Sequence, residues 1–322
     1  ELVIRQLVEE CALIQTSDRI LILFDFKTKN IAQNIYSYIK NKKVFEYIHI
    51  KSVDNLKIHG DEPDLKTQDL IKKSTLIYCL TSFSLAHCQS VRNTLKKGAR
   101  FLSLPDYSDE VIKSEAFRAK FLSYREGCIE VSRILTKANK VKVKTSLGTN
   151  IEFILNNRIS NPAPGCVINP GDLSSPPDIE SNIAPIENST NGILIIDGSI
   201  PIPSIGLLIK PIKIFVENGI CKEIKGDFNV VNELEAKLTK NKLRRTIGEF
   251  GIGLNPYSKI VGRMLEDEGA FNTCHFGIGA NTTIGGLNKC NGHIDLVMKN
   301  PNFEIDGEEL DLFKLFKSKI KL

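Results

Sequence analysis

The run ILILF, residues 20–24, sets the fold class of the first half of the chain. Five apolar residues in succession predict a strand that is buried on both faces of a sheet. A second run of this kind, LIYCL, follows at 76–80. Helical patterns at 31–39 and 91–97 alternate with such runs, and this alternation predicts an open α/β domain with a mostly parallel sheet.

The residues after the first strand argue against a bound dinucleotide. The segment DFKTK, residues 25–29, contains no glycine. A Rossmann-type site needs a glycine-rich loop at this place, because only glycine lets the backbone approach the pyrophosphate. We therefore expect the first domain to serve as a lid, a dimer surface or a wall of the substrate site.

The second half of the chain has a different pattern. Residues 141–145 and 151–155 alternate between apolar and polar side chains and flank a turn, which predicts a β-hairpin. We predict an α/β domain over 1–125 and a β-rich, metal-binding catalytic domain over 126–322. The segment 156–185, rich in Pro, Gly, Ser and Asn, is expected to be a long functional loop.

Composition restricts the classes of function. The chain of 322 residues is 42% hydrophobic and 25% charged, which is typical of an ordinary soluble globular protein. Its formal net charge of +5 is not gathered into a patch with aromatic residues, so we expect no nucleic-acid partner. No apolar run approaches the ~20 residues that span a bilayer. Eight scattered cysteines without a CxxC pair indicate reduced thiols, and we expect a cytoplasmic protein with no membrane partner.

Two histidines and an aspartate in the last third of the chain are candidate metal ligands. His293 and Asp295 lie two residues apart in the alternating run GHIDLVM, which predicts a strand with both side chains on one face. An imidazole and a carboxylate side by side are ligands for a divalent ion. Taken alone, the motif also fits a hydrogen-bonded pair on a solvated sheet. His275 lies in CHFGIGANTTIGG, where it is either a third ligand or a core histidine bonded to a carbonyl.

Glu249 is a candidate ligand because of its glycine-rich, apolar surroundings. It lies in the run GEFGIGLNP, residues 248–256. An ionised carboxylate is costly to bury unless it is paired, so this position calls for a metal ion, a basic side chain or a proton. An ordinary salt-bridged glutamate is the alternative.

Three motifs occur in order: GEFGIGLNP, then LEDEGAFNTCHFGIG at 265–279, then GGLNKCNGHIDLV at 285–297. Together they resemble the aminopeptidase T-like family of metallopeptidases. The resemblance implies a homodimer that uses two divalent ions, Zn, Co or Mn, to cleave a small peptide or amide from its amino terminus. It places the metal ligands at Glu180, Glu249, His275, His293 and Asp295.

The role of Glu180 rests on the resemblance alone. Like the first glutamate of the family, it precedes a short run that ends in Ala-Pro. The resemblance gives Glu249 one of two roles, as a ligand or as the group that accepts the proton of the attacking water, and Glu249 is therefore also the candidate catalytic residue.

One position departs from the family pattern. Family peptidases carry a tyrosine shortly after the histidine, where this chain has Thr282, and a missing phenol predicts slow peptide cleavage. The chain also resembles 2,5-dihydroxypyridine dioxygenase, a ring-cleaving enzyme with one non-haem Fe(II), for which His275, His293 and Asp295 would form the facial triad. A specialised biosynthetic member is the third possibility. Because both glutamates are present, we favour the two-metal hydrolase.

Overall fold

The chain forms two compact units. The computed structural model describes residues 2–42, 44–54, 56–239 and 241–317. Unit 1 consists of Glu1–Leu122 and Pro164–Pro176, and unit 2 consists of Ser123–Ala163 and Pro177–Leu322. None of the helices within the described ranges is long and apolar enough to cross a membrane.

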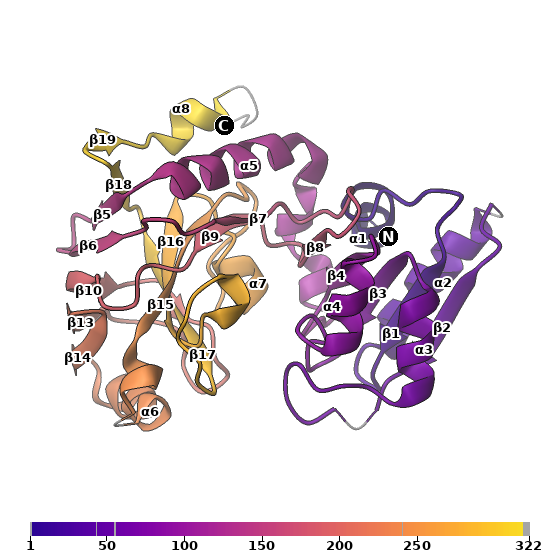
Figure 1. Ribbon diagram of the computed structural model, residues 1–322, viewed down its shortest axis with the longest axis horizontal. Helices are drawn as coiled ribbons and strands as arrows, with labels where there is room; N and C mark the ends of the chain where they lie inside the picture. The colour runs from indigo at the N-terminus through magenta and orange to yellow at the C-terminus, as the bar shows by residue number, and fades with distance from the viewer. Residues whose placement is uncertain (1, 43, 55, 240, 318–322) are drawn as a thin grey trace. The chain divides into compact units, whose positions relative to one another are not determined.

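Unit 1 is built on a five-stranded parallel sheet in the order β2-β1-β3-β4-β8. The strands are β1 (Ile20–Phe24), β2 (Ile48–Ser52), β3 (Leu76–Leu80), β4 (Arg100–Ser103) and β8 (Leu173–Ser174). The predicted runs at 20–24 and 76–80 coincide with β1 and β3, and the predicted open α/β architecture with a parallel sheet is confirmed (Figure 1).

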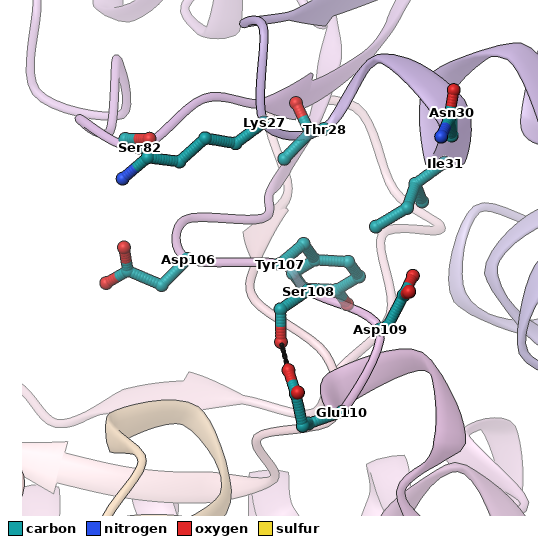
Figure 2. Close-up of a pocket in the computed structure, with 10 residues that line it drawn as sticks. All are labelled: Lys27, Thr28, Asn30, Ile31, Ser82, Asp106, Tyr107, Ser108, Asp109 and Glu110. Atoms are coloured by element: carbon teal, nitrogen blue, oxygen red, sulfur yellow. Dashed lines mark hydrogen bonds between the residues drawn. The ribbon is translucent and has the colours of Figure 1, made fainter.

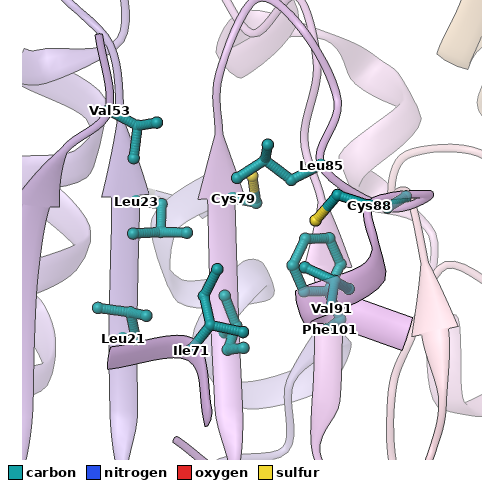
Figure 3. Packing of buried hydrophobic residues seen from close by; sticks show 11 residues of the cluster. Leu21, Leu23, Val53, Ile71, Cys79, Leu85, Cys88, Val91 and Phe101 are labelled. Atoms are coloured by element: carbon teal, nitrogen blue, oxygen red, sulfur yellow. The ribbon is translucent and has the colours of Figure 1, made fainter. Parts of the chain in front are cut away.

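Helices pack on this sheet through apolar side chains. They are α1 (Leu2–Gln6), α2 (Lys29–Asn41), α3 (Leu65–Lys73) and α4 (Gln89–Leu95), with short helical turns at Leu7–Cys11, Val111–Lys113 and Glu115–Arg118. Figure 3 shows Ile71 of α3 and Val91 of α4 against Leu21, Leu23 and Phe101 of the strands, all of them buried. This cluster holds one face of the sheet away from water.

The segment Pro164–Pro176, which the sequence analysis assigned to the second domain, lies in unit 1. Its two-residue strand β8 pairs with β4, and such a short strand leaves no readable pattern. The buried guanidinium of Arg100 donates a hydrogen bond of 3.0 Å to the carbonyl of Val167 and one of 2.6 Å to Asp18. The bond to Val167 ties the returning segment to the sheet.

Unit 2 contains two seven-stranded antiparallel sheets. The first has the order β14 (Ile220–Lys225), β13 (Ile212–Glu217), β10 (Asn191–Ile196), β6 (Asn150–Ile154), β5 (Lys140–Lys144), β18 (Asn302–Ile305) and β19 (Glu308–Glu309). The second has the order β12 (Gly206–Leu207), β11 (Ser199–Ile200), β17 (His293–Lys299), β16 (Thr273–Gly279), β15 (Ile247–Gly253), β9 (Glu180–Ile183) and β7 (Asn161–Ala163). The predicted β-rich second half is confirmed.

Phenylalanines join the two sheets of unit 2. Phe153 and Phe303 come from the first sheet, and Phe250 and Phe276 come from the second. Phe250 contacts each of the other three rings, and Phe276 also contacts Phe153, with ring centroids 4.9 to 6.0 Å apart in these pairs. Because side chains alternate along a strand, this packing leaves the neighbours of Phe250 and Phe276 on the opposite face of the second sheet.

Helices complete unit 2: α5 (Phe121–Lys137), which begins just before the unit boundary, α6 (Phe228–Leu238), α7 (Met264–Asp267) and α8 (Leu312–Phe316), with short turns at Lys242–Arg245 and Thr282–Ile284. Cys128 of α5 accepts a hydrogen bond of 2.7 Å from Ser181 of β9 through its carbonyl. The expected long loop at 156–185 is therefore only partly a loop, because it contains β7, β8 and the buried strand β9.

Candidate metal centre

Four neighbouring strands of the second sheet carry the predicted ligands. Glu180 opens β9, Glu249 lies in β15, His275 in β16, and His293 and Asp295 in β17. The strands β9, β15, β16 and β17 are adjacent. In each one the ligand positions alternate with residues such as Phe250 or Phe276 that face the aromatic core, so the ligands share the other face.

The glycines of the motifs provide the space for these ligands. A side chain on a strand lies beside that of its cross-strand partner, and glycine leaves this place empty. The register pairs Gly251 with His275, Gly277 with both Glu249 and Asp295, Gly279 with His293, and Gly253 with Glu180. The repeated GxG spacing of β15 and β16 therefore leaves room beside the imidazoles and carboxylates that a side chain would otherwise fill.

The ligand atoms gather into two groups that share one residue. One group is Glu180, Glu249 and His275, the other is Glu249, His293 and Asp295, and within each group the ligand atoms all lie within 4.8 Å of one another. His275 Nε2 lies 3.3 Å from Glu180 Oε2 and 3.7 Å from Glu249 Oε1. His293 Nε2 lies 3.1 Å from Glu249 Oε2 and 3.0 Å from Asp295 Oδ1. Glu249 thus turns one oxygen toward each histidine.

The second ring nitrogen of His293 is already engaged. Nδ1 lies 2.8 Å from the carbonyl oxygen of Ala280, and a carbonyl only accepts, so Nδ1 carries the proton of the neutral ring. Nε2 therefore faces Glu249 and Asp295. In the free protein it carries the second proton of the ring, because these carboxylates raise the pKa of His293 well above its usual value against the effect of burial. Loss of that proton would free Nε2 to bind a metal ion, with Nδ1 held by the carbonyl as is usual for a metal-binding histidine.

The charges of the cluster perturb one another strongly. Burial alone would lower the pKa of His275, but the carboxylates of Glu180 and Glu249 raise it to about 9. Burial raises the pKa of Glu180 to about 7, against the opposing effect of His275. Burial would also raise the pKa of Asp295, but His293 lowers it to about 2. In the free protein, protons on the histidines therefore offset the carboxylates.

The donor set fits divalent metal ions. Glu180 Oε2 and His275 Nδ1 are buried without a hydrogen-bond partner, which is costly unless a further group completes their environment. Buried carboxylates facing neutral imidazoles are the usual environment of a divalent cation. A cation would take over the role of the protons on His275 and His293.

Two acidic residues beside the cluster were not predicted from the sequence. Asp178 and Glu268 are buried, and burial, followed by the charges of the neighbouring carboxylates, raises the pKa of each well above its usual value. Glu268 lies within hydrogen-bond reach of Asp295, so it donates to that carboxylate when protonated. The sequence signal was present, because Asp178 lies two residues before Glu180 and Glu268 lies in the motif before His275.

Thr282, the departure from the family pattern, lies outside both ligand groups. It begins the short helical turn Thr282–Ile284, and its side chain is exposed. The preceding residue, Asn281, is buried and donates a hydrogen bond of 3.2 Å to the carbonyl of Gly248, which fixes where the turn starts.

Gly277→Ala is expected to disturb the cluster without changing a ligand. A Cβ at Gly277 would lie 2.4 Å from His293 Cε1 and 2.8 Å from Glu249 Cβ, so both ligands must shift. We expect metal affinity, measured by competition with a chelating dye, to fall by about tenfold to a hundredfold, as for changes to residues that support a ligand.

Ile278→Val is the matched control for this variant. Ile278 lies on the same strand as Gly277, but its side chain points to the opposite face of the sheet. The substitution should lower the free energy of unfolding by about 1 kcal/mol and leave the metal affinity unchanged. Wild-type metal affinity in a folded Gly277→Ala protein would show that the cluster does not depend on this glycine.

The sequence of this chain matches the model of one known protein family. The model of the family described as 2,5-dihydroxypyridine 5,6-dioxygenase matches residues 39–311. An uncharacterized protein of Bacillus subtilis, YbfF, is 28% identical over 140 residues, which is 42% of this chain and 42% of that protein. The chain thus matches less than half the length of this relative.

Two solved structures share the fold. A 2,5-dihydroxypyridine dioxygenase from Pseudomonas putida KT2440 superimposes with a TM-score of 0.79 at 17% identity, over 96% of this chain and 93% of the other. Wild-type AmpT from Thermus thermophilus superimposes with a TM-score of 0.68 at 11% identity, over 96% of each chain. Both kinds of protein named by the sequence resemblance therefore have this architecture.

Proposed function

This chain belongs to the 2,5-dihydroxypyridine 5,6-dioxygenase family, and from that premise we propose that it is a metal-dependent enzyme that hydrolyses a peptide or amide bond with two divalent ions. Membership in an enzyme family whose fold is shared with AmpT supports an enzyme. The reaction itself depends on the site rather than on the fold.

The observation that carries the proposal is the position of Glu249. It belongs to both ligand groups, with Oε1 toward His275 and Oε2 toward His293. A carboxylate with one oxygen directed to each group suits a bridge between two ions. The trio His275, His293 and Asp295 that a mononuclear iron site requires is not one of the two groups among the described residues.

Each residue then has a role in holding the ions. Glu180 and His275 would hold one ion, His293 and Asp295 would hold the other, and Glu249, which belongs to both groups, would be the ligand common to both. In this role Glu249 would bind metal rather than only accept a proton. The bound ions supply a Lewis acid for the scissile carbonyl and lower the pKa of a water near them. When protonated, Glu268 would donate a hydrogen bond to Asp295 and help to hold that carboxylate in place.

A mononuclear Fe(II) dioxygenase is the second candidate function, and the match to the family model favours it. Such an enzyme would use His275, His293 and Asp295 and leave Glu180 and Glu249 without a metal. These two carboxylates would then lie buried beside the histidines with only protons to offset them, which makes this arrangement less favourable.

The two functions differ in their need for oxygen, because a dioxygenase consumes it and a hydrolase needs only water. Zn is redox-inert, so we expect a hydrolase loaded with Zn, Co or Mn to release an N-terminal amino acid from short unblocked peptides under nitrogen. The rate should be low and should rise in Thr282→Tyr if the family phenol is what is missing. Amino-acid release is followed by chromatography with heat-denatured protein as the control.

The dioxygenase gives a different pattern in the same assay. It would consume oxygen with a dihydroxylated pyridine when loaded with Fe(II), and it would release no amino acid with any metal. That outcome would replace our first proposal with the second.

A further inference from the structure

The strand order of the parallel sheet in unit 1 reverses between β1 and β3. From β1 the chain adds β2 on one side, and it then crosses to the other side for β3 and β4. In open α/β sheets, ligands bind beyond the carboxyl ends of the strands at such a switch point, because the connecting loops diverge there and leave a crevice.

A cavity of about 460 Å³ opens at this place in unit 1. Its lining comes from the segments that follow three strands, and its volume falls in the range of small-molecule pockets, roughly 300–1,000 Å³. We call it the switch-point pocket, and Figure 2 shows its lining residues: Lys27, Thr28, Asn30 and Ile31 after β1, Ser82 after β3, and Asp106, Tyr107, Ser108, Asp109 and Glu110 after β4. All of them belong to unit 1, whereas the metal ligands belong to unit 2.

Hydrogen bonds hold the loops around the pocket in place. The carboxylate of Asp25 accepts a bond of 2.9 Å from the backbone N–H of Lys27 and one of 2.6 Å from that of Ser82. The hydroxyl of Thr28 donates to the carbonyl of Leu80. The loops on the two sides of the switch point are therefore tied together, and the pocket exists before any ligand enters.

The two walls of the pocket carry opposite charges. Figure 2 shows Lys27 and Asn30 on the side of the β1–α2 connection, and Asp106 and Asp109 on the side of the segment after β4. Glu110 adds a third carboxylate and accepts a bond of 2.7 Å from Ser108 Oγ.

The buried side chains of Ile31 and Tyr107 lie between these walls. One ammonium group and three carboxylates give the lining a net charge of −2, taking Lys27 as +1 and Asp106, Asp109 and Glu110 as −3.

From these features we propose that the switch-point pocket binds a small zwitterion in which ammonium groups outnumber carboxylates, that is, a basic amino acid. The ligand carboxylate pairs with Lys27 on one wall, the two cationic groups pair with Asp106 and Asp109 on the other, and the aliphatic chain lies over Ile31 and Tyr107. The net negative lining favours such a ligand over a neutral or acidic amino acid. The proposal does not depend on which reaction the metal centre performs.

Calorimetric titration of the full chain with L-lysine tests the proposal, with L-glutamate as the comparison ligand. We expect L-lysine to bind and L-glutamate to give no heat. Asp109→Asn and Lys27→Ala should each weaken L-lysine binding by about tenfold, as for the loss of one charge-assisted hydrogen bond. Asp69→Asn and Lys72→Ala, which change the same residue types on α3, should leave it unchanged.

A metallopeptidase also binds amino acids at its metal centre, so the same titration is repeated with Glu249→Ala freed of metal. Unchanged L-lysine binding there, together with weak binding in the Asp109 and Lys27 variants, supports the switch-point pocket. Three results would overturn the proposal: no binding of L-lysine up to about 10 mM, binding lost in metal-free Glu249→Ala, or binding unchanged by Asp109→Asn and Lys27→Ala.

Discussion

Glu249→Ala is expected to empty both halves of the metal centre. Glu249 is the one residue common to the two ligand groups, so its loss removes a carboxylate from each and leaves only two ligands in either group. Two ligands do not hold a divalent ion in competition with a chelator. We expect the metal content of the purified variant to fall to well under one ion per chain and any catalytic activity to be lost with it.

Variants of residues that belong to one group only provide the comparison. Glu180→Ala and Asp295→Ala should each lose mainly one of two ions. Glu152→Ala, which changes a glutamate on β6 outside the cluster, should behave as wild type. Far-ultraviolet circular dichroism verifies that each variant is folded. If folded Glu249→Ala retained two ions, Glu249 would not be a ligand shared by both.

His293→Ala is the second change with a large expected effect. Its Nε2 lies 3.0 Å from Asp295 and 3.1 Å from Glu249, and its Nδ1 is held by the carbonyl of Ala280. These contacts hold the ring with Nε2 facing the other ligands of its group, and this group contains no second histidine that could take its place. We expect activity to fall by at least about a hundredfold, because losing a ligand exceeds the ~10–100-fold effect of losing an outer partner.

The three histidines of unit 1 are the controls for this change. His49, His59 and His87 do not belong to either ligand group, and their alanine variants should keep the metal content and activity of the wild type. If His293→Ala retained full metal content as well, the His293 and Asp295 motif would be a hydrogen-bonded surface pair, as its sequence alone allowed.

The strongest sequence patterns predicted the elements that matter most for the site. Uninterrupted apolar runs located β1 and β3, and the alternation of polar and apolar residues at the start of GHIDLVM located β17 with His293 and Asp295 on one face. Both patterns reflect burial directly, since a strand buried on two faces is apolar throughout and a ligand face alternates with a core face.

Elements stabilised by distant parts of the chain were not readable in the same way. The segment around Glu180 looked like a polar loop because ESNI has one apolar residue, yet β9 is buried between β7 and β15. The helix α3, LKTQDLIKK, was missed because most of its residues face water. Asp178 and Glu268 were missed because their burial depends on tertiary packing rather than on local pattern.

The glycines show both what the sequence signals and what it leaves out. Their density in GEFGIG and HFGIG indicated a close approach, but only the register shows that His275 lies over Gly251 and that Gly277 lies between Glu249 and Asp295. Register between strands is a property of the folded sheet, so the identity of the approaching group could not be predicted from either motif alone.

The most direct test of a two-ion centre is the metal content of the wild-type protein. Protein purified without added metal is loaded with Zn, Co or Mn, desalted, and measured by elemental analysis against its concentration from amino-acid analysis. Two ligand groups that share Glu249 predict about two ions per chain, bound more tightly than millimolar. Less than about half an ion per chain with every metal would contradict the account, and a single ion retained only as iron would favour the dioxygenase.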